Sequence, residues 1–295
     1  MESGAALQDR RSAALPALAI FAAMVSTYAG AAFAKQLFPL VGSEGVVALR
    51  VGLSALLLAA FARPWRALPA RADIPNLVLY GLTLGCMNLL IYRAFSRIPI
   101  GVAVSIEVMG PLGVVLLSSR RARDFVWVAC AGLGLWLLLP LRAGAQLLNP
   151  ALDPAGVACA AGAAFCWALY IVFGKRVSQS KQQSQGSNAV AWGMLAASVF
   201  IVPVGAAYAG TALLSPWVLA AGLAVAVLSS AAPYTLEMIA LRKLPRRVFG
   251  ILVSASPAVA ALAGFMVLGE RLAGAQWLGI GLVMLACGAT AASAS

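Results

Sequence analysis

The sequence predicts an all-α integral membrane protein with ten transmembrane helices, arranged as two inverted five-helix repeats. Apolar runs of membrane-spanning length recur along the chain, basic residues favour one side of them, and short motifs of the first half return in the second. Of the 295 residues, 62% are hydrophobic and 10% are charged, with a mean hydropathy of +0.94. Soluble domains are nearer 45–50% apolar and about 25% charged, which argues against a water-soluble enzyme.

The expected membrane spans follow one another with short separators. A helix needs about 20 apolar residues to cross the bilayer core. Such segments lie at 15–37, 44–62, 74–95, 100–119, 124–141, 154–174, 189–207, 216–241, 247–268 and 272–291. Residues 1–14 form a polar N-terminal tail, followed by the first repeat (15–142) and the second repeat (154–291). The first apolar run is longer than the core of a cleaved signal peptide, so we expect it to remain as a helix.

The basic residues predict the orientation of the helices. With the N-terminus inside, five of the 21 Lys and Arg lie at outer ends, namely Lys35, Arg93, Arg97, Arg142 and Arg271. Arg50 lies within a span, and the other fifteen fall on the inner side: Arg10, Arg11, Arg63, Arg66, Arg71, Arg120, Arg121, Arg123, Lys175, Arg176, Lys181, Arg242, Lys243, Arg246 and Arg247. Cytoplasmic loops carry an excess of Lys and Arg, so both termini and the tail 1–14 are expected in the cytoplasm. The cations form no basic stripe interleaved with aromatic residues, and we expect no nucleic-acid partner.

Residues that are absent exclude several kinds of chemistry. The chain has no histidine and no GxxxxGK[ST] motif, and its aspartates lie in loops. This excludes a Ser-His-Asp triad, an HExxH zinc site, ATP hydrolysis by this chain and an intramembrane aspartate pair. The five cysteines fall inside apolar runs without metal-binding spacing, as small buried hydrophobes do. We therefore expect no enzyme activity, no cofactor and no metal.

The two halves of the chain repeat short motifs. The run AFSRIP at 94–99 aligns with ALRKLP at 240–245, which lies 146 residues later in the sequence. Pro111 and Pro257 are separated by the same 146 residues. Each repeat holds five spans, and an odd number of spans inverts the second repeat relative to the first. Inverted repeats with a site near the bilayer midplane are common in secondary transporters.

Several runs are more specific than general hydrophobicity. They are FPLVG at 38–42, ALR at 48–50, Glu107 with GPL at 110–112, SSRR at 118–121, DFVWV at 124–128, LGLW at 133–136, LSSA at 228–231 and PYTLEMIAL at 233–241. In these runs the chain resembles the EamA-type drug/metabolite transporter superfamily, and within it the inner-membrane threonine and homoserine exporters. The resemblance covers nearly the whole chain. It departs from the family pattern at Ser256, where many relatives carry Glu before the proline, and at Arg93, where an apolar residue is expected.

The resemblance implies a ten-helix exporter with two EamA-type repeats in a bacterial inner membrane. Its expected substrate is a small amino acid, and protons are the expected coupling ion. The expected partners are the substrate, protons and the lipid bilayer, and a homodimer is the candidate assembly. An exporter of other metabolites or drugs on the same fold is the first alternative. A non-transporting membrane subunit is a second, although such a subunit does not require carboxylates within spans of both halves.

Three charged residues within the spans are the main candidates for the site. A charge at mid-membrane costs about 2.5–3.5 kcal/mol on insertion scales and so requires a reason. At 1.5 Å per residue, Glu107 lies about 10 Å below the outer end, Arg50 at a similar depth, and Glu237 about 12 Å from the inner end. In the functional interpretation Glu107 exchanges protons, Arg50 faces an amino-acid carboxylate and Glu237 is a second protonatable site. In the structural one, Glu107 and Arg50 neutralise each other and Glu237 binds nearby basic residues.

Polar and aromatic residues within the spans complete the predicted site. Asn88, Tyr92, Tyr234, Trp167 and Tyr170 can supply hydrogen bonds and walls to a small polar solute, although each aromatic side chain can also serve in packing or at the membrane interface.

Two prolines are candidates for helix kinks and gating. Pro111 and Pro257 lie within spans at equivalent positions of the two repeats. Each removes a backbone hydrogen bond and frees a carbonyl, which either shapes a site or is a tolerated kink.

Overall fold

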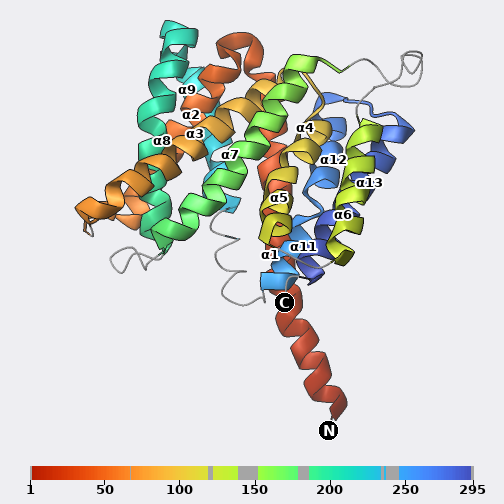
Figure 1. The fold of residues 1–295 in the computed structure, drawn as a ribbon. Coiled ribbons are helices and arrows are strands. Elements are labelled where there is room, and N and C mark those ends of the chain that lie inside the picture. Colours follow the sequence, from red (N-terminus) through yellow and green to blue (C-terminus); the bar gives the residue numbers. More distant parts are fainter. Residues whose placement is uncertain are drawn as a thin grey trace.

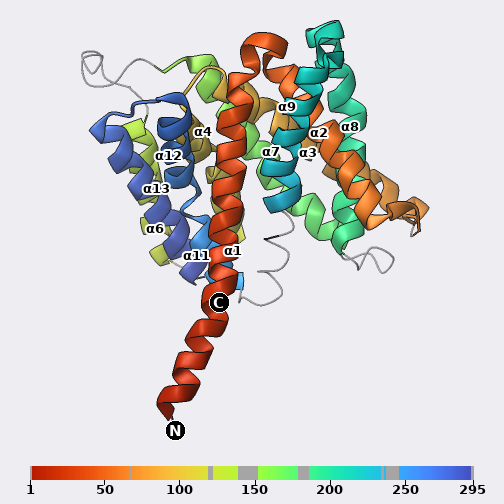
Figure 2. The ribbon, with the colours of Figure 1, turned by 180° about the vertical axis from the view of Figure 1, so that it is seen from behind.

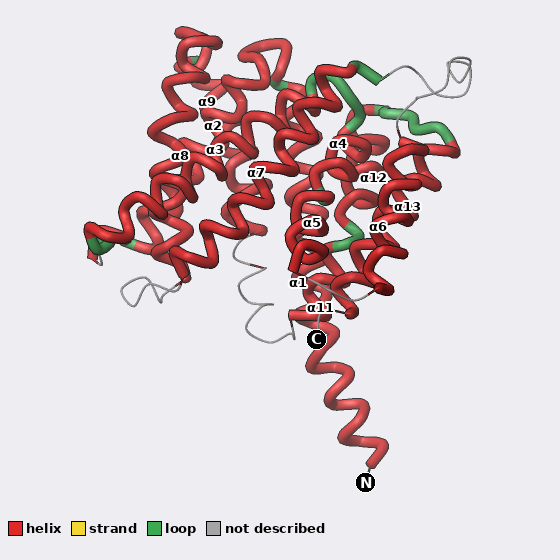
Figure 3. Tube along the Cα trace, in the orientation of Figure 1, coloured by secondary structure: helices red, strands yellow, loops and turns green. Residues whose placement is uncertain are grey.

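The computed structural model describes residues 2–66, 68–118, 122–138, 152–178, 186–233, 236 and 246–293. All regular elements in these ranges are helices (Figures 1 and 3). The helices are α1 (Glu2–Gln36), α2 (Phe38–Ala62), α3 (Ile74–Phe95), α4 (Ile100–Glu107), α5 (Met109–Ser118), α6 (Ala122–Leu138), α7 (Pro154–Ser178), α8 (Gly186–Ala209), α9 (Pro216–Ala226), α11 (Arg246–Val253), α12 (Ser256–Leu268) and α13 (Gly274–Ser293). Short turns are η1 (Pro64–Arg66), η2 (Arg71–Asp73), η4 (Gly210–Leu214) and the π-turn η5 (Val227–Ala231).

Each of the ten expected segments overlaps a helix. Seven helical segments are long and apolar enough to cross a bilayer, and shorter apolar helices cover 100–114, 126–138 and 216–231. The first helix begins at Glu2, so the expected tail is the start of α1, and this end projects away from the body (Figures 1 and 2). The chain is therefore a multi-pass membrane protein.

Two of the expected spans contain a break in the helix. The segment 100–119 is broken at Val108, between α4 and α5, and the segment 247–268 is broken at 254–255, between α11 and α12. A proline follows each break, Pro111 in α5 and Pro257 in α12. Proline has no N–H to donate to the carbonyl four residues earlier, which explains why both helices break at equivalent positions.

The helices form two bundles with two helices between them. The first bundle consists of α2, α3, α8 and α9 with η5, and the second of α4–α5, α6, α11–α12 and α13. The remaining helices, α1 and α7, are called here the seam helices, because each packs against both bundles. Figure 1 shows α7 on the near side of the molecule and Figure 2 shows α1 there. Each bundle takes helices from both halves of the sequence, so the halves do not form separate bodies.

Small residues allow several helices to cross at backbone distance. A Cβ at Gly101 of α4 would lie 2.5 Å from the Cβ of Ala261 in α12. A Cβ at Gly110 of α5 would clash with the backbone carbonyl oxygen of Ala164 in α7. Close packing of small residues is a main source of helix association in membranes, where lipid is as apolar as the helix surface.

Substitution of Gly110 by Ala is expected to destabilise the protein, because α5 and α7 would have to move apart. Overpacking of this kind costs about 1–3 kcal/mol. The matched control is Gly113→Ala on the same helix, where a Cβ meets nothing within 4 Å. Since Ala is favoured over Gly by up to about 1 kcal/mol in a helix, the control should be neutral or stabilising. Thermal unfolding in detergent measures both, and equal Tm values for the two variants would contradict the packing argument.

Candidate functional site

Two adjoining cavities lie between the bundles and the seam helices. The polar cavity has a volume of about 150 Å³ and is lined by Thr27, Tyr28, Ala31, Arg50, Met87, Asn88, Ile91, Tyr92, Phe95, Glu107 and Trp167. The central cavity has a volume of about 360 Å³ and is lined by Met24, Thr27, Tyr28, Arg50, Leu84, Met87, Trp167, Tyr170, Ser229, Pro233, Phe249, Val253 and Ser256. Because Arg50 and Trp167 line both cavities, they form the boundary between the two spaces.

Arg50 of α2 is held in position by groups from α3 and the π-turn η5. Its Nη1 donates to Asn88 Oδ1 at 2.8 Å, its Nη2 donates to the carbonyl oxygen of Ser229 at 3.1 Å, and its guanidinium lies 5.2 Å from the centre of the Tyr92 ring. Asn88 Nδ2 in turn donates to the Leu84 carbonyl at 2.8 Å, which fixes the amide with its oxygen toward Arg50. The guanidinium is therefore fixed in orientation before any ligand binds.

Two buried donors beside this cavity lack a hydrogen-bond partner among the described residues. They are Arg50 Nε and the Tyr92 hydroxyl. A buried donor without a partner costs about 1–3 kcal/mol, and such groups in a protein require an explanation. A ligand oxygen would supply the missing acceptor.

Glu107 is the last residue of α4 and lines the polar cavity with only 8% of its surface exposed. It interacts electrostatically with Arg50. The direct salt bridge of the structural interpretation is not formed, since the ion pairs of the described residues are Lys35–Glu270, Arg93–Glu44 and Arg97–Asp153. Arg50 is instead directed to Asn88 and Ser229. Both charges thus remain available to a ligand.

The predicted site residues fall into three groups. Arg50, Asn88, Tyr92, Glu107 and Trp167 come together around the polar cavity. Tyr170 lines the central cavity and accepts a hydrogen bond from the Tyr80 hydroxyl at 3.0 Å. Tyr234 and Glu237 lie outside the described residues.

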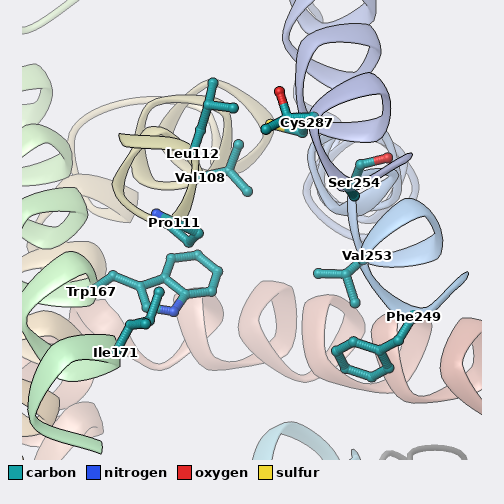
Figure 4. A pocket seen from close by; sticks show the side chains of 12 residues that line it. Val108, Pro111, Leu112, Trp167, Ile171, Phe249, Val253, Ser254 and Cys287 are labelled. Atoms are coloured by element: carbon teal, nitrogen blue, oxygen red, sulfur yellow. The ribbon is translucent and has the colours of Figure 1, made fainter. Parts of the chain in front are cut away.

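The two prolines differ in their surroundings. Pro111 lines a third, apolar cavity of about 280 Å³, whereas Pro257 is buried at the start of α12 and lines none of the three cavities. Figure 4 shows Pro111 above the Trp167 indole, with Val253 and Phe249 across the apolar cavity. The break residues Val108 and Ser254 both line this cavity, so the two broken helices meet there.

Residues of α1 and η5 also belong to the site, although they were not predicted from the sequence. Thr27 and Tyr28 line both the polar and the central cavity, and the Ser229 carbonyl accepts from Arg50. The polar run Ser26-Thr27-Tyr28 in the middle of an apolar span was a signal that could have found the first two. A backbone carbonyl acceptor leaves no such trace in a sequence.

Arg93 and Ser256, the two departures from the family pattern, occupy different places. Arg93 Nε donates to Glu44 Oε1 at 2.8 Å, and its guanidinium lies 5.8 Å from the centre of the Tyr208 ring, outside the three cavities. Ser256 is buried and lines the central cavity. Arg93 is thus accounted for by its pairing with Glu44, and Ser256 is a wall of the site.

Two further ion pairs lie at helix ends. Glu270 accepts from Lys35 Nζ at 2.7 Å and from the backbone N–H of Ile100 at 2.9 Å, so it joins the end of α1 to the start of α4. Arg97 Nη1 donates to Asp153 Oδ2 at 2.8 Å, and this hydrogen bond lowers the pKa of the Asp153 carboxyl and raises the pKa of Arg97. These contacts stabilise the ends of the helices that carry the site.

Comparison with known proteins identifies relatives along nearly the whole chain. Residues 154–291 match the EamA-like transporter family. The threonine/homoserine exporter RhtA of Salmonella typhimurium is 49% identical over 272 residues, which cover 92% of this chain and 90% of RhtA, and RhtA of Escherichia coli K12 is 48% identical with the same coverage. The uncharacterized transporter YwfM of Bacillus subtilis is 28% identical over 250 residues, 82% of this chain and 81% of YwfM. A crystal structure of a protein of 20% identity superposes with a TM-score of 0.56 over 96% of both chains, so the two share a fold.

Proposed function

The chain belongs to the EamA-like transporter family, and from this premise we propose that it exports small amino acids of the threonine and homoserine type, in exchange for protons, by alternating access. The observation that carries the proposal is the pairing of charges at the polar cavity. Arg50 on one side is complementary to a carboxylate, and Glu107 on the other is complementary to an ammonium group. A zwitterionic amino acid carries both groups on adjacent atoms.

The proposed binding mode uses the unpartnered donors. The substrate carboxylate accepts from Arg50 Nε and the Tyr92 hydroxyl, while Asn88 and Ser229 keep the guanidinium in place. The substrate ammonium donates to Glu107. Hydrogen bonds to charged groups contribute about 1.5–3 kcal/mol each, so a solute lacking either charge binds much more weakly.

Exchange of the substrate for protons follows if the Glu107 carboxylate is the binding site for both. Glu107 binds either the substrate ammonium or a proton, and the two cannot occupy it together. A carrier that reorients with either partner bound then moves substrate outward as protons move inward. An exporter of drugs is the alternative, but bulky apolar cations would leave Arg50 without an acceptor.

We further propose ten membrane spans in two inverted repeats, with both termini in the cytoplasm of a bacterial cell. The packing pattern supports this arrangement: α2 packs on α8 and α6 on α13, and α7 packs on α3 and α4–α5 as α1 packs on α9 and α11–α12. If each span of the first repeat is matched with the span at the same place in the second repeat, every one of these helix contacts maps onto another of them or onto itself. The distribution of Lys and Arg supports the orientation. A homodimer stays a prediction.

Transport assays in proteoliposomes test the proposal. With an inward-directed proton gradient imposed across the membrane, labelled threonine and homoserine should move against their gradients, and a protonophore should abolish this movement. Threonine amide and 1-amino-2-propanol, which lack the carboxylate, are the matched controls and should compete at least tenfold more weakly. No threonine or homoserine transport by folded, reconstituted protein would overturn the amino-acid assignment, and efflux of lipophilic cations would favour the drug alternative.

A further inference from the structure

The apolar cavity is lined by neither Arg50 nor Glu107. Its volume of about 280 Å³ is lined largely by the side chains of Val108, Pro111, Leu112, Ile171, Phe249 and Val253 (Figure 4). The two hydroxyl groups in its wall already have acceptors, since Ser254 Oγ donates to the Ile251 carbonyl at 2.6 Å and Thr290 Oγ1 donates to the Ala286 carbonyl at 2.7 Å. The cavity therefore suits an apolar group.

This cavity adjoins the charged site. It shares Trp167, Phe249 and Val253 with the central cavity, and the central cavity shares Arg50 and Trp167 with the polar cavity. Trp167 is a wall of all three. Figure 4 shows the Trp167 indole on one side of the apolar cavity and Phe249 and Val253 on the other, so Trp167 stands between this cavity and the site at Arg50.

We infer that the apolar cavity is a subsite for the side chain of the substrate, and that the transporter therefore also exports α-amino acids with longer apolar side chains. This inference rests on the proposed amino-acid export and extends its substrate range. The occupant follows from the wall that the cavities share: with the ammonium and carboxylate at Glu107 and Arg50, a substrate side chain directed at Trp167 faces the apolar cavity. A lipid acyl chain, the other apolar occupant of a membrane cavity, has no group for Arg50 and Glu107 together.

A series of unbranched amino acids tests the inference. In proteoliposomes, 2-aminobutyrate, norvaline, norleucine and 2-aminooctanoate compete with labelled threonine. Burial of a methylene contributes about 0.8 kcal/mol, so the half-inhibitory concentration should fall by up to about fourfold per added carbon until the cavity is filled. Labelled norleucine should itself be transported. A lipid-filled cavity would instead give no dependence on chain length.

Variants at Ile171 place the effect in this cavity. Ile171 lines the apolar cavity but neither of the others, whereas its neighbour Val172 lines none of the three and is 39% exposed. Ile171→Trp fills the cavity and should raise the norleucine-to-threonine ratio of half-inhibitory concentrations at least tenfold. Ile171→Ala enlarges the cavity and should move the optimum to a longer side chain, so the test does not depend on one variant folding. Val172→Trp is the matched control and should leave the ratio unchanged.

The outcomes separate this inference from the proposed function. Threonine transport without any dependence on chain length, or identical ratios for Ile171→Trp and Val172→Trp, would overturn the subsite alone. Failure to transport any amino acid of the series, threonine included, would overturn the proposed function and the subsite together.

Discussion

Replacement of Glu107 by Gln is expected to abolish proton-driven accumulation of threonine while the protein remains folded. Gln has nearly the same volume, so the cavity wall is kept, but it carries no charge and exchanges no proton. The substrate ammonium also loses a charged acceptor worth about 1.5–3 kcal/mol, which corresponds to roughly 10–100-fold in affinity. Accumulation under an imposed pH gradient measures the first effect, and equilibrium binding of labelled threonine measures the second.

The contacts of Arg50 make this substitution interpretable. Arg50 keeps its hydrogen bonds to Asn88 and Ser229 when Glu107 is neutral, so we expect little loss of Tm in detergent. Glu44→Gln is the control. It also replaces a carboxylate by an amide, but this carboxylate pairs with Arg93 and lies outside the cavities. If the double variant Arg50→Leu with Glu107→Leu were stable and transported nearly normally, the two charges would be structural and the proposed mechanism would fail.

Replacement of Arg50 by Lys is expected to raise the half-saturating concentration of threonine by roughly 10–100-fold, the loss of a charged hydrogen bond of about 1.5–3 kcal/mol. Lys keeps the charge, but one ammonium cannot bind Asn88 and the Ser229 carbonyl, lie over the Tyr92 ring and still present a donor to the substrate. The planar guanidinium does all of these at once.

Threonine amide distinguishes a lost carboxylate contact from general damage. Because the amide has no carboxylate, its weak competition should change little in the Arg50→Lys protein. Arg93→Lys is the matched control, since its guanidinium pairs with Glu44 outside the cavities. Equal losses for threonine and its amide would show that Arg50 supports the fold rather than binds the substrate.

The charged part of the site was predictable because helical rise converts sequence position into depth. Arg50 and Glu107 lie at similar distances from the same ends of their spans, and the structure brings both to one cavity. Sequence position does not give the rotation of one helix against another. This explains why the sequence left open whether Arg50 and Glu107 form an ion pair, whereas in the structure Asn88 accepts the hydrogen bond from Nη1 of Arg50.

Features that depend on backbone groups or loops were not predictable. The Ser229 carbonyl that holds Arg50 lies in a π-turn, and nothing in the side chains of 227–231 requires that geometry. Glu270 lies between α12 and α13, and its contacts with Lys35 and the Ile100 N–H arise only from the packing of distant segments. The two prolines predicted kinks in their helices, but the sequence did not give the exact place of the break, which in the first repeat comes three residues before Pro111.

The position of the seam helices has a mechanical consequence. A Cβ at Gly30 of α1 would lie 3.1 Å from the backbone nitrogen of Ser229 in the first bundle, and Gly110 of the second bundle touches the backbone of Ala164 in α7. Because a glycine meets the neighbouring backbone at each point, we expect these two contacts to keep their separation and the angle between the helices to change instead. The two seam helices lie on opposite sides of the molecule (Figures 1 and 2), so we expect the contacts to act as pivots. If each bundle is stiff, we expect a rotation about these contacts that separates the bundles at one end of the molecule to bring them together at the other end.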